Sequence, residues 1–340
     1  TINNTPPVAN AGENITITSD QISVTTINGT ATDFDGNPLT CRWTEGLTVL
    51  QNWTPVGALG ECPLNLSALS FSLGAHTLTL EANDGQTTSS NIMVLTINNS
   101  APHAAPGGAG VYEINTPVIL PGDVSDFDGD MLYYDWTEGT NVLCSGNIQS
   151  IAGGISVLLP DCVVSNLSLG MHTISLQVSD GFNLPDTKSI TVQIIDNIAP
   201  KLKPKANIYI LWPPNHRMVD IAIAANATDN SGCPVTLNAT VKSNEPQYGL
   251  GSGDIGPDWT QPVIDQTTGM IYLQLRAERS GRGKGRIYTI TITATDCSGN
   301  ISTAKVKIRV PHDKDNEDRK REDREERDRD DRDERHDSDE

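Results

Sequence analysis

The chain has 340 residues, a formal net charge of −19 and only 5% aromatic residues. This length allows two or three domains, and the many Gly, Pro, Thr, Ser and Asn residues are typical of short strands joined by tight turns rather than of a helical protein. The negative charge argues against binding to nucleic acid or anionic lipid. The absence of any run of 18 apolar residues argues against a membrane span.

The chain begins with the segment TINNTPPVANAGENITIT and carries no charged and apolar leader. A protein whose export signal has been removed would begin in this way, so we expect an extracellular or cell-surface location. Because the segment is rich in Thr and Ile, it predicts a strand. We expect this strand to add to an open sheet edge of a neighbouring copy.

Two segments of the chain repeat each other. TATDFDGNPLTCRWTEG (30–46) recurs 93 positions later as DVSDFDGDMLYYDWTEG (123–139), and SLGAHTLTLEANDG (72–85) recurs 96 positions later as SLGMHTISLQVSDG (168–181). This period is too long for a solenoid repeat and suits tandem β-sandwich domains.

Proline-rich junctions at Pro6, Pro102 and Pro200 separate the repeats. They predict an all-β chain of three sandwich domains, held end to end in an extended rod because proline stiffens the linkers. The boundaries that follow are 1–98, 99–196 and 197–310, with a charged low-complexity tail at 311–340. The tail cannot bury a core, so we expect it to be disordered.

Apolar and polar residues alternate within each repeat, as in HTLTLEAN (76–83). Such alternation predicts strands with one buried face. The residues expected on that face are Leu78, Leu80, Ala82, Ile174, Leu176 and Val178. Trp43 and Trp136 follow turns in equivalent strands, and we expect them to fill the space between two sheets.

The six cysteines divide evenly among the three predicted domains. This distribution predicts one disulfide in each domain, formed in an oxidising compartment. The expected pairs are Cys41 with Cys62, Cys144 with Cys162, and Cys233 with Cys297. The alternative is six buried free thiols. No pair has the CxxC spacing of zinc or thioredoxin-type sites.

Ten asparagines begin an Asn-x-Ser/Thr triplet, the acceptor motif for N-glycosylation. They are Asn3, Asn14, Asn28, Asn52, Asn65, Asn98, Asn166, Asn226, Asn238 and Asn300. A glycosylated surface is one interpretation. The other is an unmodified, Thr-rich strand surface in which the triplets arise from composition.

The pattern PPVANAG, ATDFDGNPLTCRW and SLGAHTLTLEANDG resembles PKD-type (polycystic-kidney-disease-like) domains over residues 6–98 and, more weakly, over 102–196. The resemblance implies Ig-like sandwiches of the kind found in tandem in secreted and surface proteins. Both repeats depart from the family, because WTEG replaces its usual WDFGDG turn. Cys41 precedes its tryptophan whereas Cys144 follows its own, so the two disulfides would join different strand pairs. The third domain, with ATDNSGCPV and ATDCSGNIS, resembles HYR-like and bacterial Ig-like modules.

The two DFDG loops place oxygen-bearing side chains at every second position, and an Asn/Ser-Asp-Gly turn follows in each repeat. Ca²⁺ prefers such ligands and needs six to eight oxygens. Related modules bind calcium in this region, as the resemblance implies. The predicted ligands are Asp33, Asp35, Asn37, Asp84, Asp126, Asp128, Asp130 and Asp180. The alternative is a strand-connecting turn capped by aspartate. In the third domain Asp196, Asp229, Asn230, Asp296 and Asn300 form a weaker candidate.

The sequence contains no known catalytic motif, so we do not expect an enzyme. His76 and His172 occupy equivalent strand starts and are expected to pack or to hold turns. The basic stretch RAERSGRGKGR, with Arg276, Arg279, Arg282, Lys284 and Arg286, predicts either a mobile hairpin tip that docks an acidic surface or a solvated loop.

Together these features predict an extracellular structural protein that self-associates into a surface filament, sheath or surface layer. The alternative is an adhesin or carbohydrate-binding region of a larger secreted protein, which would bind surface glycans or another surface protein. Trp53, Trp212 and Trp259 are then the residues expected to stack on a sugar or contact a partner.

Overall fold

The computed structural model describes residues 3–248 and 254–312, and the tail predicted for 311–340 lies outside this range from residue 313 onward. The described chain is nearly all β-structure; its two 3-10 helices are Ser19–Val24 and Leu66–Ala68. It divides into two compact units, the second of which begins at Ile195 and also includes Glu113–Asn115.

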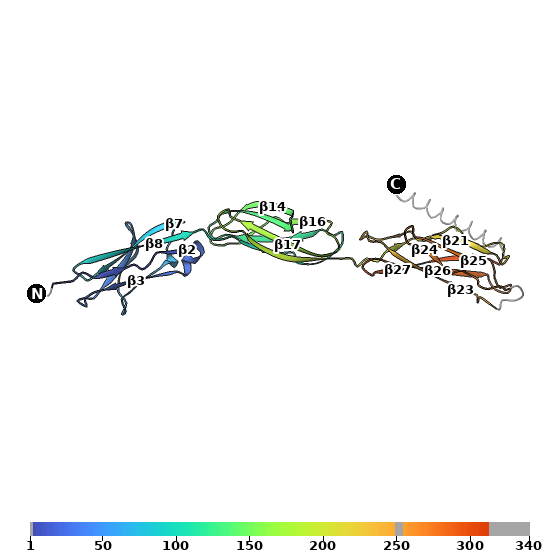
Figure 1. Cartoon of the computed structure of the whole chain (residues 1–340), viewed down its shortest axis with the longest axis horizontal. Coiled ribbons are helices and arrows are strands. Elements are labelled where there is room, and N and C mark those ends of the chain that lie inside the picture. Colours follow the sequence, from blue (N-terminus) through green and yellow to red (C-terminus); the bar gives the residue numbers. More distant parts are fainter. Residues whose placement is uncertain (1–2, 249–253, 313–340) are drawn as a thin grey trace, which may run out of the picture. The chain divides into compact units, whose positions relative to one another are not determined.

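The N-terminal part of the first unit is a β-sandwich of two sheets, of three and five strands, in the orders β1-β3-β6 and β2-β8-β7-β4-β5 (Figure 1). The strands are β1 (Val8–Asn10), β2 (Ile15–Thr18), β3 (Thr26–Thr32), β4 (Thr40–Glu45), β5 (Thr48–Pro55), β6 (Glu61–Asn65), β7 (Gly74–Asn83) and β8 (Thr88–Asn98).

The expectation that the N-terminal segment pairs with a neighbouring copy is wrong for Val8–Thr18. Strand β1 pairs antiparallel with β3, and β2 pairs parallel with β8 of the same sandwich. This pairing buries Ala9 and Ala11 against the core. The segment therefore supplies an edge strand to each sheet of its own sandwich.

The rest of the first unit repeats this plan with the strand orders β10-β18-β17-β13-β14, β15-β12-β9 and β11-β16. The strands are β9 (His103–Pro106), β10 (Gly110–Glu113), β11 (Val118–Leu120), β12 (Gly122–Ser125), β13 (Met131–Glu138), β14 (Asn141–Gln149), β15 (Val157–Leu158), β16 (Cys162–Val164), β17 (Gly170–Ser179) and β18 (Asp186–Ile195).

A tryptophan fills the centre of each of these two sandwiches, as predicted. Trp43 and Trp136 have no exposed surface, and each lies opposite a leucine, Leu80 or Leu176, on the neighbouring strand. A glycine passes close to each indole ring, because a Cβ on Gly29 or Gly122 would lie 2.5 or 2.8 Å from the ring atom Cζ2. The repeat thus preserves a large residue together with the small residue that makes room for it.

Three disulfides join the cysteines in the pairs expected from their spacing. Cys41 lies on β4 and Cys62 on β6, whereas Cys144 lies on β14 and Cys162 on β16. Since β14 follows its tryptophan strand and β4 is the tryptophan strand itself, the two bridges join different strand pairs, as the shifted cysteine positions predicted.

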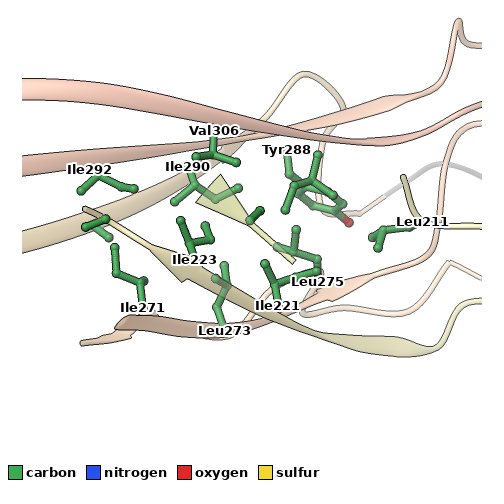
Figure 2. Close-up of a cluster of buried hydrophobic side chains, with 14 of the residues drawn as sticks. Leu211, Ile221, Ile223, Ile271, Leu273, Leu275, Tyr288, Ile290, Ile292 and Val306 are labelled. Atoms are coloured by element: carbon green, nitrogen blue, oxygen red, sulfur yellow. The ribbon is translucent and has the colours of Figure 1, made fainter. Parts of the chain in front are cut away.

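The second unit has sheets in the orders β20-β21-β25-β24, β23-β26-β27 and β19-β22. Its strands are β19 (Lys201–Leu202), β20 (Lys205–Ala206), β21 (Met218–Ala224), β22 (Ala227–Thr228), β23 (Thr236–Ser243), β24 (Val263–Asp265), β25 (Met270–Arg276), β26 (Arg286–Thr295) and β27 (Ile301–Val310). Aliphatic side chains from facing sheets meet in its core, with Ile221 and Leu275 on one side and Ile290 on the other (Figure 2).

Candidate cation-binding loops

The first DFDG loop folds around the carboxylate of Asp33. Asp33 Oδ1 accepts the backbone N–H groups of Asp35 and Asn37, at 2.9 and 3.1 Å, and Gly36 takes the positive φ of 73° that closes the turn. The second oxygen of Asp33, Oδ2, is buried without a hydrogen-bond partner. One carboxylate oxygen therefore builds the turn and the other remains available to a ligand.

The Asn-Asp-Gly turn after β7 is joined to this loop by the N-terminal segment. Asn4 Nδ2 donates to Asp84 Oδ2 at 2.8 Å, and Asn4 Oδ1 accepts from Asn37 Nδ2 at 3.1 Å. The Asn4 hydrogen bond, with those of the Thr87 and Gln86 backbone N–H groups, lowers the pKa of Asp84 despite some desolvation. Asp84 is therefore held ionised, but its two oxygens are both already used.

The second DFDG loop is deeper. Asp126 is 2% exposed, and its Oδ1 accepts backbone N–H groups of Asp128, Gly129 and Asp130. Oδ2 is again buried without a partner. Burial raises the pKa of Asp126, outweighing these hydrogen bonds, and the charges of Asp128 and Asp130 add to the rise. A divalent cation would relieve both effects.

Oxygen atoms of Asp126, Asp128 and Asp130 all lie within 4.8 Å of one another. Asp180 is not part of this group and is linked to the loop through Asn183. The side chain of Asn183 donates to Asp180 Oδ2 at 2.8 Å and to Asn99 Oδ1 at 2.6 Å. Burial raises the pKa of Asp180, but hydrogen bonds from Asn183 and Phe182 outweigh it, so the pKa is lowered.

The linker before β9 is fastened to the same loop. Ser100 donates its backbone N–H and its hydroxyl to Asp128 Oδ2, at 2.7 and 2.8 Å, and Asn99 Nδ2 donates to Asp130 Oδ2 at 2.5 Å. Asn4, Asn99, Ser100 and Asn183 were not predicted to take part in these loops. The signal was the repetition of NNT before Pro6 and NNS before Pro102, which the sequence indicated only as glycosylation motifs at Asn3 and Asn98.

The histidines at the two strand starts hold turns, as expected. His172 Nδ1 contacts Glu138 Oε1 at 2.6 Å, and Nε2 contacts the Ser168 carbonyl at 2.8 Å. His76 repeats both contacts with Glu45 and Ser72. Burial lowers each histidine pKa, but the carbonyl and carboxylate partners outweigh it, so both pKa values are raised.

The basic stretch of the second unit is held by three of its four arginines and is solvated at its tip. Arg286 is fully buried and pairs with Asp258 and Glu245. Arg279 donates to the Pro311 and His312 carbonyls, and Arg276 to those of Pro257 and His216. These bonds hold the stretch against the sandwich, and only Arg282 and Lys284 remain well exposed.

Two of the three candidate stacking tryptophans are exposed. Trp53 is 39% and Trp212 is 41% exposed, and the Arg42 guanidinium lies 4.8 Å from the Trp53 ring centroid. Trp259 instead packs against the core of the second unit and makes an edge contact with Tyr288. Trp259 is half-buried, and its role in glycan stacking stays a prediction.

Nine of the ten predicted glycosylation sites present an exposed asparagine; Asn300 is half-buried. Its amide donates to the Asp196 carbonyl and to Asp296 Oδ2, both at 2.9 Å. A glycan would replace one of these donor hydrogens.

The chain is similar to two curated proteins over 91% of its own length. It is 25% identical to the human dyslexia-associated protein KIAA0319 and 25% identical to the mouse dyslexia-associated protein KIAA0319-like protein. The chain spans only about a quarter of the length of these relatives (26% and 27%). No model of a known protein family matches the chain.

Similar solved structures include the ICAM-5 D1–D4 ectodomain fragment (9% identity, 89% of this chain, 76% of that one, TM-score 0.36) and protocadherin gamma B2 extracellular cadherin domains 3–6 (14%, 90%, 72%, TM-score 0.30). The sandwich fold is shown by the sheets described above. In the described part of the chain, no helix has the length and apolarity needed to cross a bilayer.

Proposed function

We propose that the chain is an extracellular structural protein whose sandwich modules are building blocks of a surface filament, sheath or surface layer. The observation that carries the proposal is the fastening of the linker at Asn99 and Ser100 to the acidic loop of the following sandwich. A linker held by side-chain hydrogen bonds resists bending between modules, which a load-bearing subunit requires. One disulfide in each module supports an oxidising, extracellular location.

Negative-stain electron microscopy tests this assignment directly. Purified protein is imaged over a series of concentrations, with added calcium and with chelator. Ordered polymers or lateral arrays are expected in at least one condition. Strictly monomeric particles in every condition would overturn the structural-subunit assignment.

We further propose that Ca²⁺ binds at the DFDG loops of the first unit. Asp126, Asp128 and Asp130 with the unpartnered oxygen of Asp126 supply the core of one site, and Asp33, Asp35 and Asn37 supply the other. Asp84 holds Asn4 and Asp180 holds Asn183 by hydrogen bonds, rather than completing the groups of oxygens. Water would fill the remaining positions, because Ca²⁺ takes six to eight oxygens.

Differential scanning calorimetry with calcium or chelator tests these sites. Calcium is expected to raise the melting temperature of the wild-type protein, because a ligand that binds only the native state stabilises it. Asp126→Asn should reduce the shift, while Asp161→Asn, at an exposed loop position of the same sandwich, should leave it unchanged. A melting temperature indifferent to calcium would reject both sites.

A second candidate is an adhesin or carbohydrate-binding role, favoured by the exposure of Trp53 and Trp212. Aromatic rings with one free face stack on sugars and on partner side chains. A glycan array with wild-type protein, Trp53→Ala and Trp212→Ala decides this case. Binding that either substitution abolishes would support adhesion, and an array without signal would remove the glycan-binding form of the proposal.

A further inference from the structure

A second group of carboxylates lies in the second unit. Asp196 follows β18, Asp229 follows β22 and Asp296 follows β26. One oxygen from each of these three residues lies within 4.8 Å of the other two. Three segments that are far apart in sequence therefore deliver negative charge to one small volume.

Each of these aspartates uses one oxygen to stabilise its own turn. Asp196 Oδ1 accepts from the Ile198 N–H at 3.0 Å, Asp229 Oδ1 from the Ser231 N–H at 2.9 Å, and Asp296 Oδ1 from the Ser298 N–H at 2.9 Å. The other oxygens of Asp196 and Asp229 are buried and have no hydrogen-bond partner. Asp196 as a whole is only 5% exposed. A buried carboxylate oxygen without a donor is costly, and a bound cation removes that cost.

The first unit supplies amide donors to some of its loop carboxylates, although Asp33 Oδ2 and Asp126 Oδ2 also lack a partner. There Asn4 and Asn99 donate hydrogen bonds to Asp84 and Asp130. In the second unit an aspartate, Asp196, comes from the linker. Among the described residues, Asn300 donates to Asp296 Oδ2, and none of the ion pairs there includes any of the three carboxylates. The cluster carries three negative charges with a single amide donor.

Covalent and hydrogen-bonded supports hold the three turns together. The Cys233–Cys297 disulfide joins the turn that begins at Asp229 to the turn that begins at Asp296. Asn300 Nδ2 bonds both the Asp196 carbonyl and Asp296 Oδ2. The carboxylates are thus kept close despite their mutual repulsion, so the scaffold is preorganised for a cation.

We propose that Asp196, Asp229 and Asp296 form a calcium site in the second unit. Their hard, anionic oxygens match Ca²⁺, and the irregular arrangement of three turns suits its flexible coordination better than the strict octahedron of Mg²⁺. This inference does not depend on whether the chain polymerises.

The test is isothermal titration calorimetry with calcium on the full chain. The substitutions Asp33→Asn and Asp126→Asn are introduced first, to weaken calcium binding at the DFDG loops. This background chain is expected to bind one calcium ion. Adding Asp196→Asn or, separately, Asp229→Asn should weaken that binding at least tenfold. Asp265→Asn is the matched control, because Asp265 caps a turn of the same unit and has both oxygens partnered; it should leave the affinity unchanged.

Asparagine keeps the capping oxygen of each turn, and thermal unfolding in chelator verifies that each variant folds. The Asp33→Asn/Asp126→Asn background chain tests the proposal even if a further variant fails to fold. If this background chain binds no calcium, the proposal is overturned. Equal calcium affinity in the background chain and in the folded Asp196→Asn and Asp229→Asn variants also overturns it. Tighter binding of magnesium than of calcium would overturn the assignment of the ion. If electron microscopy shows no polymers while the background chain still binds calcium, only the structural role is rejected and the calcium site stands.

Discussion

At the scale of single residues, the repeat shows which positions the fold cannot vary. The tryptophan and glycine pairs Trp43 with Gly29 and Trp136 with Gly122 are the clearest case, because no side chain larger than hydrogen fits beside either ring. The sequence predicted the buried tryptophans from their place after a turn. It did not predict the glycines, since a glycine in a strand gives no sign of which ring lies against it.

Gly29→Ala is expected to destabilise the first unit by about 1–3 kcal/mol, the usual cost of overpacking a core. The added Cβ would lie 2.5 Å from Trp43 and 2.8 Å from Leu80, and both of these side chains are fully buried. Gly281→Ala is the control, because a Cβ there has no neighbour within 4 Å. Urea unfolding of both variants measures the difference, and equal stability would show that the core relaxes around the methyl group.

The raised pKa values of His76 and His172 predict a pH dependence of stability. A group whose pKa is higher in the folded state stabilises fully below its unfolded pKa, near 6.5, and this contribution is lost as pH rises through the folded value. The stabilisation that these two histidines give the first unit should therefore decline as the pH rises above about 6.5, and the melting temperature should decline with it.

The double variant His76→Gln/His172→Gln should remove this contribution, whereas His103→Gln, at a histidine that is 63% exposed, should keep it. Calorimetric melting at a series of pH values makes the comparison. An identical pH profile in wild type and double variant would contradict the prediction.

At the scale of elements, strands and disulfides were predictable where the signal lay within a short stretch of sequence. The alternation of Leu78, Leu80 and Ala82 predicted their buried face, and all three are fully buried. The parallel pairing of β2 with β8 was not predictable, since strand propensity is the same for pairing within a copy and between copies. The buried Arg286 was missed because its partners Glu245 and Asp258 lie 41 and 28 residues away in sequence.

The disulfides should differ in their contribution to stability. Cys233–Cys297 closes a separation of 64 residues and Cys41–Cys62 one of 21, which in the chain-entropy model corresponds to about 4 and about 3 kcal/mol. Replacing both cysteines of one bridge by serine and measuring urea unfolding tests the order. A larger loss in the Cys41–Cys62 variant would show that strain or solvation outweighs loop entropy.

At the scale of the whole molecule, the repeat was the most informative feature of the sequence. It predicted a tandem of all-β sandwiches, but not the register in which their strands pair. The acidic loops were also visible in the sequence, since Asp33, Asp126 and Asp229 each precede a tight turn. What could not be predicted was which carboxylate oxygens are left without a donor, because the donors Asn4, Asn99 and Asn183 come from linkers and neighbouring turns.

The division into two units predicts two thermal transitions. The first unit, up to Ile194, and the second, from Ile195, are separate compact units. The core of the second unit shares no residue with the core around Trp43, so the two units should unfold independently of each other. Gly29→Ala should lower one calorimetric transition, and Asp196→Asn should change the calcium response of the other. A single transition that moves with both substitutions would show that the units unfold together.

The Cys233–Cys297 bridge has a consequence for the maturation of the protein. The turns that carry Asp229 and Asp296 are held together by this bond, so a reduced chain lacks the brace that opposes repulsion between them. We expect the protein to respond poorly to calcium while it is still inside a reducing compartment and to acquire full affinity only after oxidation. Calcium would then distinguish chains with the native bridge from misoxidised ones, and secretion would itself act as the step that activates the site.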